Sequence, residues 1–286
     1  KKITKDAVMS MIKIQLDQMI YEMMMGRRVN FRYSDVSGVF KSKNFFEYIK
    51  RILSAGDEKI PQVIHEKKPI LHILTHNLLG HGEILFETLN DKLIFLEIIR
   101  HPLYMIIQQT YNQQNFYNNS GKKRQFHLCF SNNGEESFFW NKDYIKEFKE
   151  CNPVERAILE INNFYLLTNY IKSKNINYKK NIETIVFEEF VLNPNVIMER
   201  LIKKLQTKKS NKTNKILKKN KVPRIKLADS IPLNIYKRCG WQPPIKGLTE
   251  KEELNLRMDF VIKNNARKKY VELIQKISYE YEKNYL

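Results

Sequence analysis

The order of apolar and polar residues along the chain predicts several helices and a few short strands. In the helical segments, apolar side chains recur every three or four residues, which is the spacing of one helix face. Helices are predicted at residues 6–25, 43–54, 83–89, 103–115, 153–172 and 194–205, and two more follow a capping box at 249–252. Continuous apolar runs at 70–74, 93–99 and 182–187 have the length of buried strands.

The first two apolar runs each end in residues that can do chemistry. The run at 70–74 leads into His76, the run at 93–99 leads into Arg100, and a helical segment lies between the runs. Strands joined through a helix pair in parallel, and ligands bind at the carboxyl ends of parallel strands. We therefore expect His76 and Arg100 at the same edge of one sheet. Pro102 then begins a helix, whose N-terminus favours an anion beside Arg100.

This alternation predicts an α/β fold with a mostly parallel central sheet flanked by helices. We expect residues 1–206 to form the α/β domain, with an Asn-rich insertion at 111–150. This insertion either covers the site or is a surface excursion packed by its own aromatic residues. Residues 207–226 are predicted to be a basic linker. Residues 227–286 are predicted to be a helical C-terminal extension packed on the same domain.

Composition narrows the class of protein. The chain has 286 residues, of which 42% are hydrophobic, so it can bury a substantial core. Its apolar runs fall far short of the ~20 residues of a membrane span, and no signal-peptide pattern opens it. Cys129, Cys151 and Cys239 lack the paired spacing of a zinc or redox site. We expect a cytoplasmic protein with buried thiols, no membrane span and no metal.

The net charge of +19 is concentrated in one stretch. Residues 203–226 contain eleven Lys or Arg and no acid. Three interpretations fit such a run: a solvated linker, a surface that captures an anionic nucleotide, or a contact for nucleic acid or membrane. Nucleic acid is the weaker interpretation, because no aromatic residues are interleaved on which bases could stack.

Three motifs, in order along the chain, resemble the sulfotransferase family. Thr75-His76-Asn77-Leu78 resembles the family's Thr-His-Leu-Pro turn, which supplies the base, and Arg100-His101-Pro102 resembles its Arg-Asn-Pro turn, which grips the 3'-phosphate of the nucleotide. The segment Phe-Glu-Glu-Phe-Val-Leu-Asn-Pro at 187–194 looks like the family's Tyr-Glu-Asp-Leu segment. The resemblance covers roughly residues 69–204 and implies a P-loop NTPase-like sulfotransferase fold.

The resemblance also implies roles for individual residues. The co-substrate would be 3'-phosphoadenosine-5'-phosphosulfate (PAPS), and the acceptor a hydroxyl of a glycan, lipid or small molecule. His76 would be the base, since histidine exchanges protons near neutral pH. Arg100 would hold the 3'-phosphate, and Gln108 stands where the family has a Ser for the same phosphate. Arg224 and Lys226 would add contacts to the same phosphate from the C-terminal part of the chain. Lys237 and Arg238 are the alternative candidates for this role.

The chain departs from the family in two places that matter. It lacks the glycine-rich 5'-phosphosulfate loop before the first helix, and Leu74 stands where the family often has Lys. We therefore expect Lys1 to be an internal start, with on the order of 15 to 30 preceding residues that would hold a strand and the loop. The alternatives are a catalytically inactive nucleotide-binding relative and a basic nucleic-acid-binding protein. The sequence gives no indication of oligomeric state.

Overall fold

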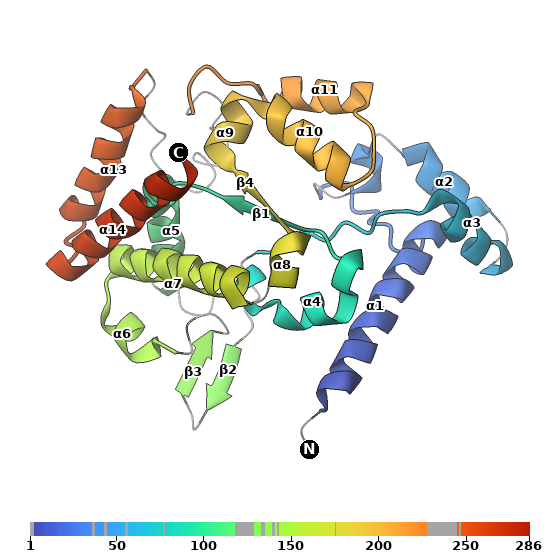
Figure 1. Cartoon of the computed structure of the whole chain (residues 1–286), viewed down its shortest axis with the longest axis horizontal. Coiled ribbons are helices and arrows are strands. Elements are labelled where there is room, and N and C mark those ends of the chain that lie inside the picture. Colours follow the sequence, from blue (N-terminus) through green and yellow to red (C-terminus); the bar gives the residue numbers. More distant parts are fainter. Residues whose placement is uncertain are drawn as a thin grey trace. The chain divides into compact units, whose positions relative to one another are not determined.

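The chain forms two compact units, Lys1–Leu93 and Ile94–Leu286. The structure, a computed structural model, describes residues 3–35, 38–42, 45–54, 57–76, 78–117, 129–132, 135–138, 141, 143–174, 176–227, 245 and 247–286 (Figure 1).

The first unit is helical. Helix α1 begins after Thr4, whose hydroxyl accepts the backbone N–H of Ala7 at 3.3 Å, and ends at Gly26, where φ is 77°. Glycine suits this left-handed C-terminal position because it has no Cβ. Lys5 joins α1 to α4 through an ion pair with Glu87. The elements of this unit are α1 (Lys5–Met25), η1 (Val39–Lys41), α2 (Phe45–Leu53), η2 (Asp57–Lys59), α3 (Ile60–Lys67), η3 (Leu79–His81), α4 (Glu83–Leu89) and η4 (Asn90–Lys92).

The predicted strand at 70–74 is not formed, so this prediction is wrong. After α3 the chain turns at Lys68, where φ is 43°, and residues 69–75 have no regular secondary structure. Ile70 is 64% exposed and Leu74 is 79% exposed. An apolar run becomes a strand only when a neighbouring strand pairs with its backbone, and no described residue pairs with this run in a sheet.

The second unit contains both sheets of the described residues. β1 pairs with β4 in parallel, and β2 pairs with β3 in antiparallel. Its elements are β1 (Phe95–Ile99), α5 (Pro102–Tyr117), β2 (Cys129–Asn132), β3 (Glu135–Phe138), α6 (Ile145–Glu150), α7 (Pro153–Lys174), α8 (Ile176–Asn181), β4 (Ile182–Val186), α9 (Phe187–Leu192), α10 (Pro194–Lys204), α11 (Asn211–Lys219), α13 (Glu250–Lys263) and α14 (Lys268–Tyr285).

The fold is broadly α/β, but helices dominate and the parallel sheet is smaller than predicted. Within the described residues it has two strands, β1 and β4, because the run at 70–74 does not join it. Helices nevertheless lie on both faces. Glu97 in β1 forms an ion pair with Lys172 of α7, whereas Glu183, which points to the opposite face, forms ion pairs with Arg200 and Lys204 of α10.

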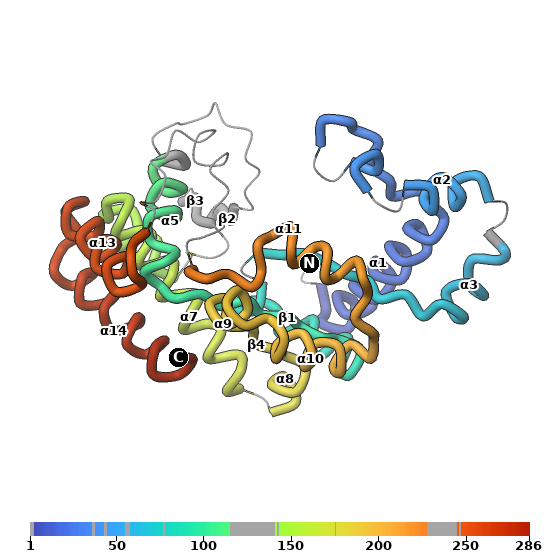
Figure 2. The backbone as a smooth tube through the Cα atoms, turned by 90° about the horizontal axis from the view of Figure 1, so that it is seen from above, coloured from blue at the N-terminus to red at the C-terminus, as the bar shows by residue number. Residues whose placement is uncertain are grey.

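The core of this unit lies where α5, α7, α13 and α14 pack side by side, as both views show (Figures 1 and 2). Ile106 of α5, Ile158 of α7 and Ile274 of α14 are completely buried there. In the last helix, the apolar residues 270, 274, 277 and 281 are buried, and Leu273 is partly buried against the same core. The C-terminal helices therefore pack into the core of this unit.

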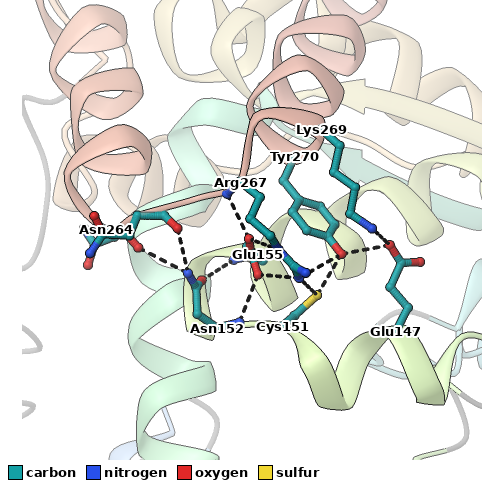
Figure 3. A network of polar contacts seen from close by, with 9 residues as sticks. Glu147, Cys151, Asn152, Glu155, Asn264, Arg267, Lys269 and Tyr270 are labelled. Atoms are coloured by element: carbon teal, nitrogen blue, oxygen red, sulfur yellow. Dashed lines mark hydrogen bonds and ion pairs between the residues drawn. The ribbon is translucent and has the colours of Figure 1, made fainter.

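A polar network fixes the turn between α13 and α14 to the start of α7 (Figure 3). The guanidinium of Arg267 donates to both carboxylate oxygens of Glu155, at 2.7 and 2.9 Å. Tyr270 donates to Glu147 at 2.8 Å, and its hydroxyl lies 2.9 Å from the thiol of Cys151. Burial raises the pKa of the Cys151 thiol, so this cysteine is a structural thiol.

Within the stretch that we predicted as a basic linker, the chain forms helix α11. Ser210 and Thr213 make a capping box at its start. Leu217 packs against the same apolar cluster as buried Val222, so this stretch is anchored to the second unit. No helix in the described part of the chain is long and apolar enough to cross a membrane.

Candidate anion-binding site

The carboxyl ends of the two parallel strands place an arginine beside an aromatic ring. Arg100 follows Ile99 of β1, and Phe187 follows Val186 of β4, the residue that pairs with Ile99. Because the strands are parallel and in register, both side chains leave the sheet at the same edge. The guanidinium carbon of Arg100 lies 4.8 Å from the centre of the Phe187 ring.

A second arginine contacts the same ring. The guanidinium carbon of Arg224 lies 5.6 Å from the ring centre of Phe187. Two hydrogen bonds hold this residue, since its backbone N–H donates to the carbonyl of Val191 and its Nη1 to the carbonyl of Leu227, both at 2.7 Å. The fold thus brings together two of the residues predicted to bind the 3'-phosphate. Two cations on one ring concentrate positive charge that suits an anion.

A second aromatic ring also contacts Arg100. The guanidinium of Arg100 also lies 5.4 Å from the ring centre of Tyr104, and that of Arg257 lies 4.8 Å from the same ring. The carboxylate of Glu253 accepts a hydrogen bond from Arg257 at 2.6 Å, so it neutralises the positive charge of Arg257. We call this set the arginine–aromatic ladder; in order of contact it consists of Arg257, Tyr104, Arg100, Phe187 and Arg224.

Glu188 ties the ends of both strands to the last helix. Its buried carboxylate accepts the backbone N–H of His101 at 3.0 Å and the hydroxyl of Tyr281 at 2.8 Å. The ring of His101 is also fixed: Nδ1 accepts from the backbone of Leu103, so Nε2 carries the proton and donates to Glu282 at 3.0 Å. These bonds hold the backbone that carries Arg100 and Phe187.

Two other predicted phosphate ligands lie elsewhere in the second unit. Gln108 is exposed on α5, two turns beyond Arg100. Lys226 is exposed, and its Nζ donates to the carbonyl of Gly247 at 3.2 Å. Lys237 and Arg238, the competing pair, lie outside the described residues.

His76 belongs to the first unit, whereas Arg100 belongs to the second. The side chain of His76 is exposed, at a bend that follows the irregular segment 69–75. The expectation that a strand carries His76 to the edge of the sheet is wrong, because that strand is not formed. Its role as a base remains a prediction.

Sequence reasoning missed the aromatic part of the site. Phe187 was recognised within a motif, but its role as a platform for two guanidinium groups was not predicted. Tyr104 could have been found, because it lies in the first turn of the helix that follows Arg100. Burial, followed by nearby carboxylates, raises the pKa of Tyr104 above its ordinary value, so its hydroxyl stays protonated near neutral pH. The described residues contain no group of three His, Cys, Asp or Glu that could hold a metal.

No family model, curated protein or solved structure matches the chain.

Proposed function

We propose that the chain is a sulfotransferase that moves a sulfuryl group from PAPS to an acceptor hydroxyl. The observation that carries this proposal is the pair of guanidinium groups, Arg100 and Arg224, on the ring of Phe187 at the carboxyl edge of the parallel strands. A ligand at this edge follows the general rule for open α/β sheets. Two arginines suit the dianionic 3'-phosphate, the group that distinguishes PAPS from ordinary adenine nucleotides.

In the proposed reaction the chain supplies binding and proton transfer. Arg100 and Arg224 would hold the 3'-phosphate through charge-assisted hydrogen bonds. The bond between sulfur and the 5'-phosphate oxygen breaks, a bond forms between sulfur and the acceptor oxygen, and His76 takes the acceptor's proton. A P-loop-like sulfotransferase fold, a cytoplasmic location and a hydroxyl acceptor are parts of the same proposal.

The first experiment measures nucleotide preference by isothermal titration calorimetry. We expect adenosine 3',5'-bisphosphate to bind roughly ten- to hundredfold more tightly than AMP, because a charge-assisted contact contributes about 1.5 to 3 kcal/mol. Arg100→Ala and Arg224→Ala should each reduce this preference. If a variant weakens both nucleotides equally, that arginine is structural.

Arg156→Ala is the matched control. Its guanidinium also lies over a phenylalanine, 5.4 Å from the ring centre of Phe148, but it belongs to α7 and donates to the carbonyl of Phe148. The variant removes a stacked arginine away from the sheet edge. It should therefore leave the preference for the bisphosphate intact.

A second measurement separates transfer from binding. Transfer of radiolabelled sulfur from PAPS to a phenol supports the enzyme, whereas selective binding of the bisphosphate without transfer indicates an inactive nucleotide-binding relative. Leu74 and Gln108, which depart from the Lys and Ser of the family, are what favours this second candidate. Binding that depends steeply on salt and ignores nucleotide identity would instead indicate a nucleic-acid-binding protein.

A further inference from the structure

A cavity of about 470 Å³ lies beside the first half of strand β4. Residues of α7, α8 and β4 line it, together with the last residue of α14. No residue of the arginine–aromatic ladder lines this cavity, so it is separate from the candidate anion-binding site. A cavity of this size can hold a small molecule when a few polar groups converge on it.

Two of the polar lining residues are already satisfied by the protein. The ammonium group of Lys172 pairs with the buried carboxylate of Glu97 at 2.5 Å, and the hydroxyl of Thr184 donates to the same carboxylate at 2.6 Å. Lys172 also lies 5.8 Å from the ring centre of Tyr285, another lining residue. These contacts hold one part of the lining in place, and the charge of Glu97 compensates that of Lys172.

Two other lining groups have no partner in the described part of the chain. The ammonium group of Lys179 makes no ion pair or hydrogen bond there, and neither does the side-chain amide of Asn169. Lys179 belongs to α8 and Asn169 to α7, so two helices bring a cation and a neutral donor to one cavity. No carboxylate is among the described residues that line the cavity, so the charge of Lys179 is not compensated within the lining.

We propose that this cavity binds a small molecule through a carboxylate group, which accepts from the ammonium group of Lys179 and the amide of Asn169. A carboxylate carries one negative charge, which matches the one uncompensated lysine, whereas a phosphate monoester carries about 1.5 to 2 at pH 7. Ile182 adds apolar surface for the rest of the molecule. This inference goes beyond the proposed function and does not depend on it, because the two sites share no residue.

The test uses benzoate as the probe and follows its binding to the whole chain by ligand-observed NMR titration. Benzamide has nearly the same shape without the charge, so it should bind roughly tenfold more weakly, as expected for the loss of a hydrogen bond between charged groups. Inorganic phosphate at the same ionic strength should bind more weakly than benzoate. Tighter binding of phosphate that depends on Lys179 would overturn the assignment to a carboxylate.

Variants locate the probe in the cavity. Lys179→Met removes the charge but keeps a long side chain, and we expect its affinity for benzoate to fall roughly tenfold. Asn169→Ala tests the same contact from α7 and should also weaken binding. Lys180→Met is the matched control, because Lys180 is exposed on the same helix but does not line the cavity, and it should retain the affinity. Thermal melting of each variant without ligand checks that the fold is intact.

Four results would overturn the inference. Benzoate fails to bind the unmodified chain, benzamide binds as tightly as benzoate, Lys179→Met retains the affinity, or Lys180→Met loses as much as Lys179→Met. The last result would mean that the general positive charge of the chain attracts the probe. Arg224→Ala guards against binding at the other site: it should leave benzoate affinity unchanged, and a loss there as large as in Lys179→Met would also refute the inference.

Discussion

The guanidinium carbon of Arg100 lies 4.8 Å from the ring centre of Phe187, although the two residues follow different strands. The register of β1 and β4 brings them together, and the same ring is also contacted by Arg224. Phe187 is therefore an aromatic contact shared by two of the residues predicted to bind the 3'-phosphate.

Replacing Phe187 tests this platform. Phe187→Leu keeps an apolar side chain but removes the electron-rich face, and each cation on a ring is worth about 0.5 to 2 kcal/mol. We expect about a tenfold weaker affinity for adenosine 3',5'-bisphosphate, measured by calorimetry. Phe190→Leu, in the same helix and against the same apolar cluster, is the control and should retain the affinity. Equal losses in both variants would show that the ring only fills space.

Glu160 should make stability depend on pH. It lies 8% exposed between α5 and α7, where it accepts from the amide of Gln113 at 2.7 Å, and burial raises its pKa to about 7. The folded state therefore holds a proton that the unfolded state releases above about pH 4.5. The stability that this bound proton gives to the folded state is complete below about pH 4.5 and is lost as the pH rises through about 7. The free energy of unfolding changes by about 3 kcal/mol over this range.

Glu160→Gln isolates this effect. A neutral amide can accept from Gln113 and can also donate to the Oε1 of Gln113, which is buried without a partner among the described residues. Urea denaturation at a series of pH values should show a variant about 2 to 3 kcal/mol more stable than the unmodified chain at pH 8, and about equal to it at pH 4.5. A constant difference across this range would mean that Glu160 does not titrate there.

Arg267 should contribute far more to stability than its neighbour Lys269. Glu155 is 2% exposed and accepts from the guanidinium of Arg267, so Arg267→Ala leaves a buried carboxylate with only backbone donors. We expect a loss of about 2 to 4 kcal/mol in the free energy of unfolding. Lys269→Ala breaks an exposed ion pair with Glu147 and should cost less than about 1 kcal/mol. Similar losses in chemical denaturation would contradict this ranking.

His76 can be tested independently of its position relative to Arg100. If His76 is the base, His76→Ala should lower turnover by about 10²- to 10⁴-fold. The variant should leave the melting temperature nearly unchanged, because the side chain is exposed. His72→Ala, which changes an exposed histidine in the irregular segment just before His76, is the matched control and should retain turnover. Turnover that survives in His76→Ala would remove this residue from the mechanism.

Local features could be read directly from the sequence. The helices at 6–25, 83–89 and 153–172 were predicted nearly at their observed bounds, because apolar spacing and end signals act within a few residues. The strand cores at 93–99 and 182–187 were also predicted, as was Arg100 between a strand and a helix that begins at Pro102.

The pairing of strands was decided by tertiary structure. The runs at 70–74 and 93–99 are similarly apolar, yet only the second becomes a strand, because β4 supplies the backbone groups that pair with it. Side-chain composition cannot choose between two such partners. The choice depends on which segments the packed helices bring together.

In the candidate site, too, some features follow from the sequence and others from the tertiary structure. The sequence by itself determined that Arg100 follows a strand and that Arg224 lies near the end of a basic stretch. That both guanidinium groups meet the ring of Phe187, and that Tyr104 lies buried beside them, was decided only by the fold. The physical reason is that contacts between residues far apart in the chain follow from packing and strand register, which no local pattern encodes.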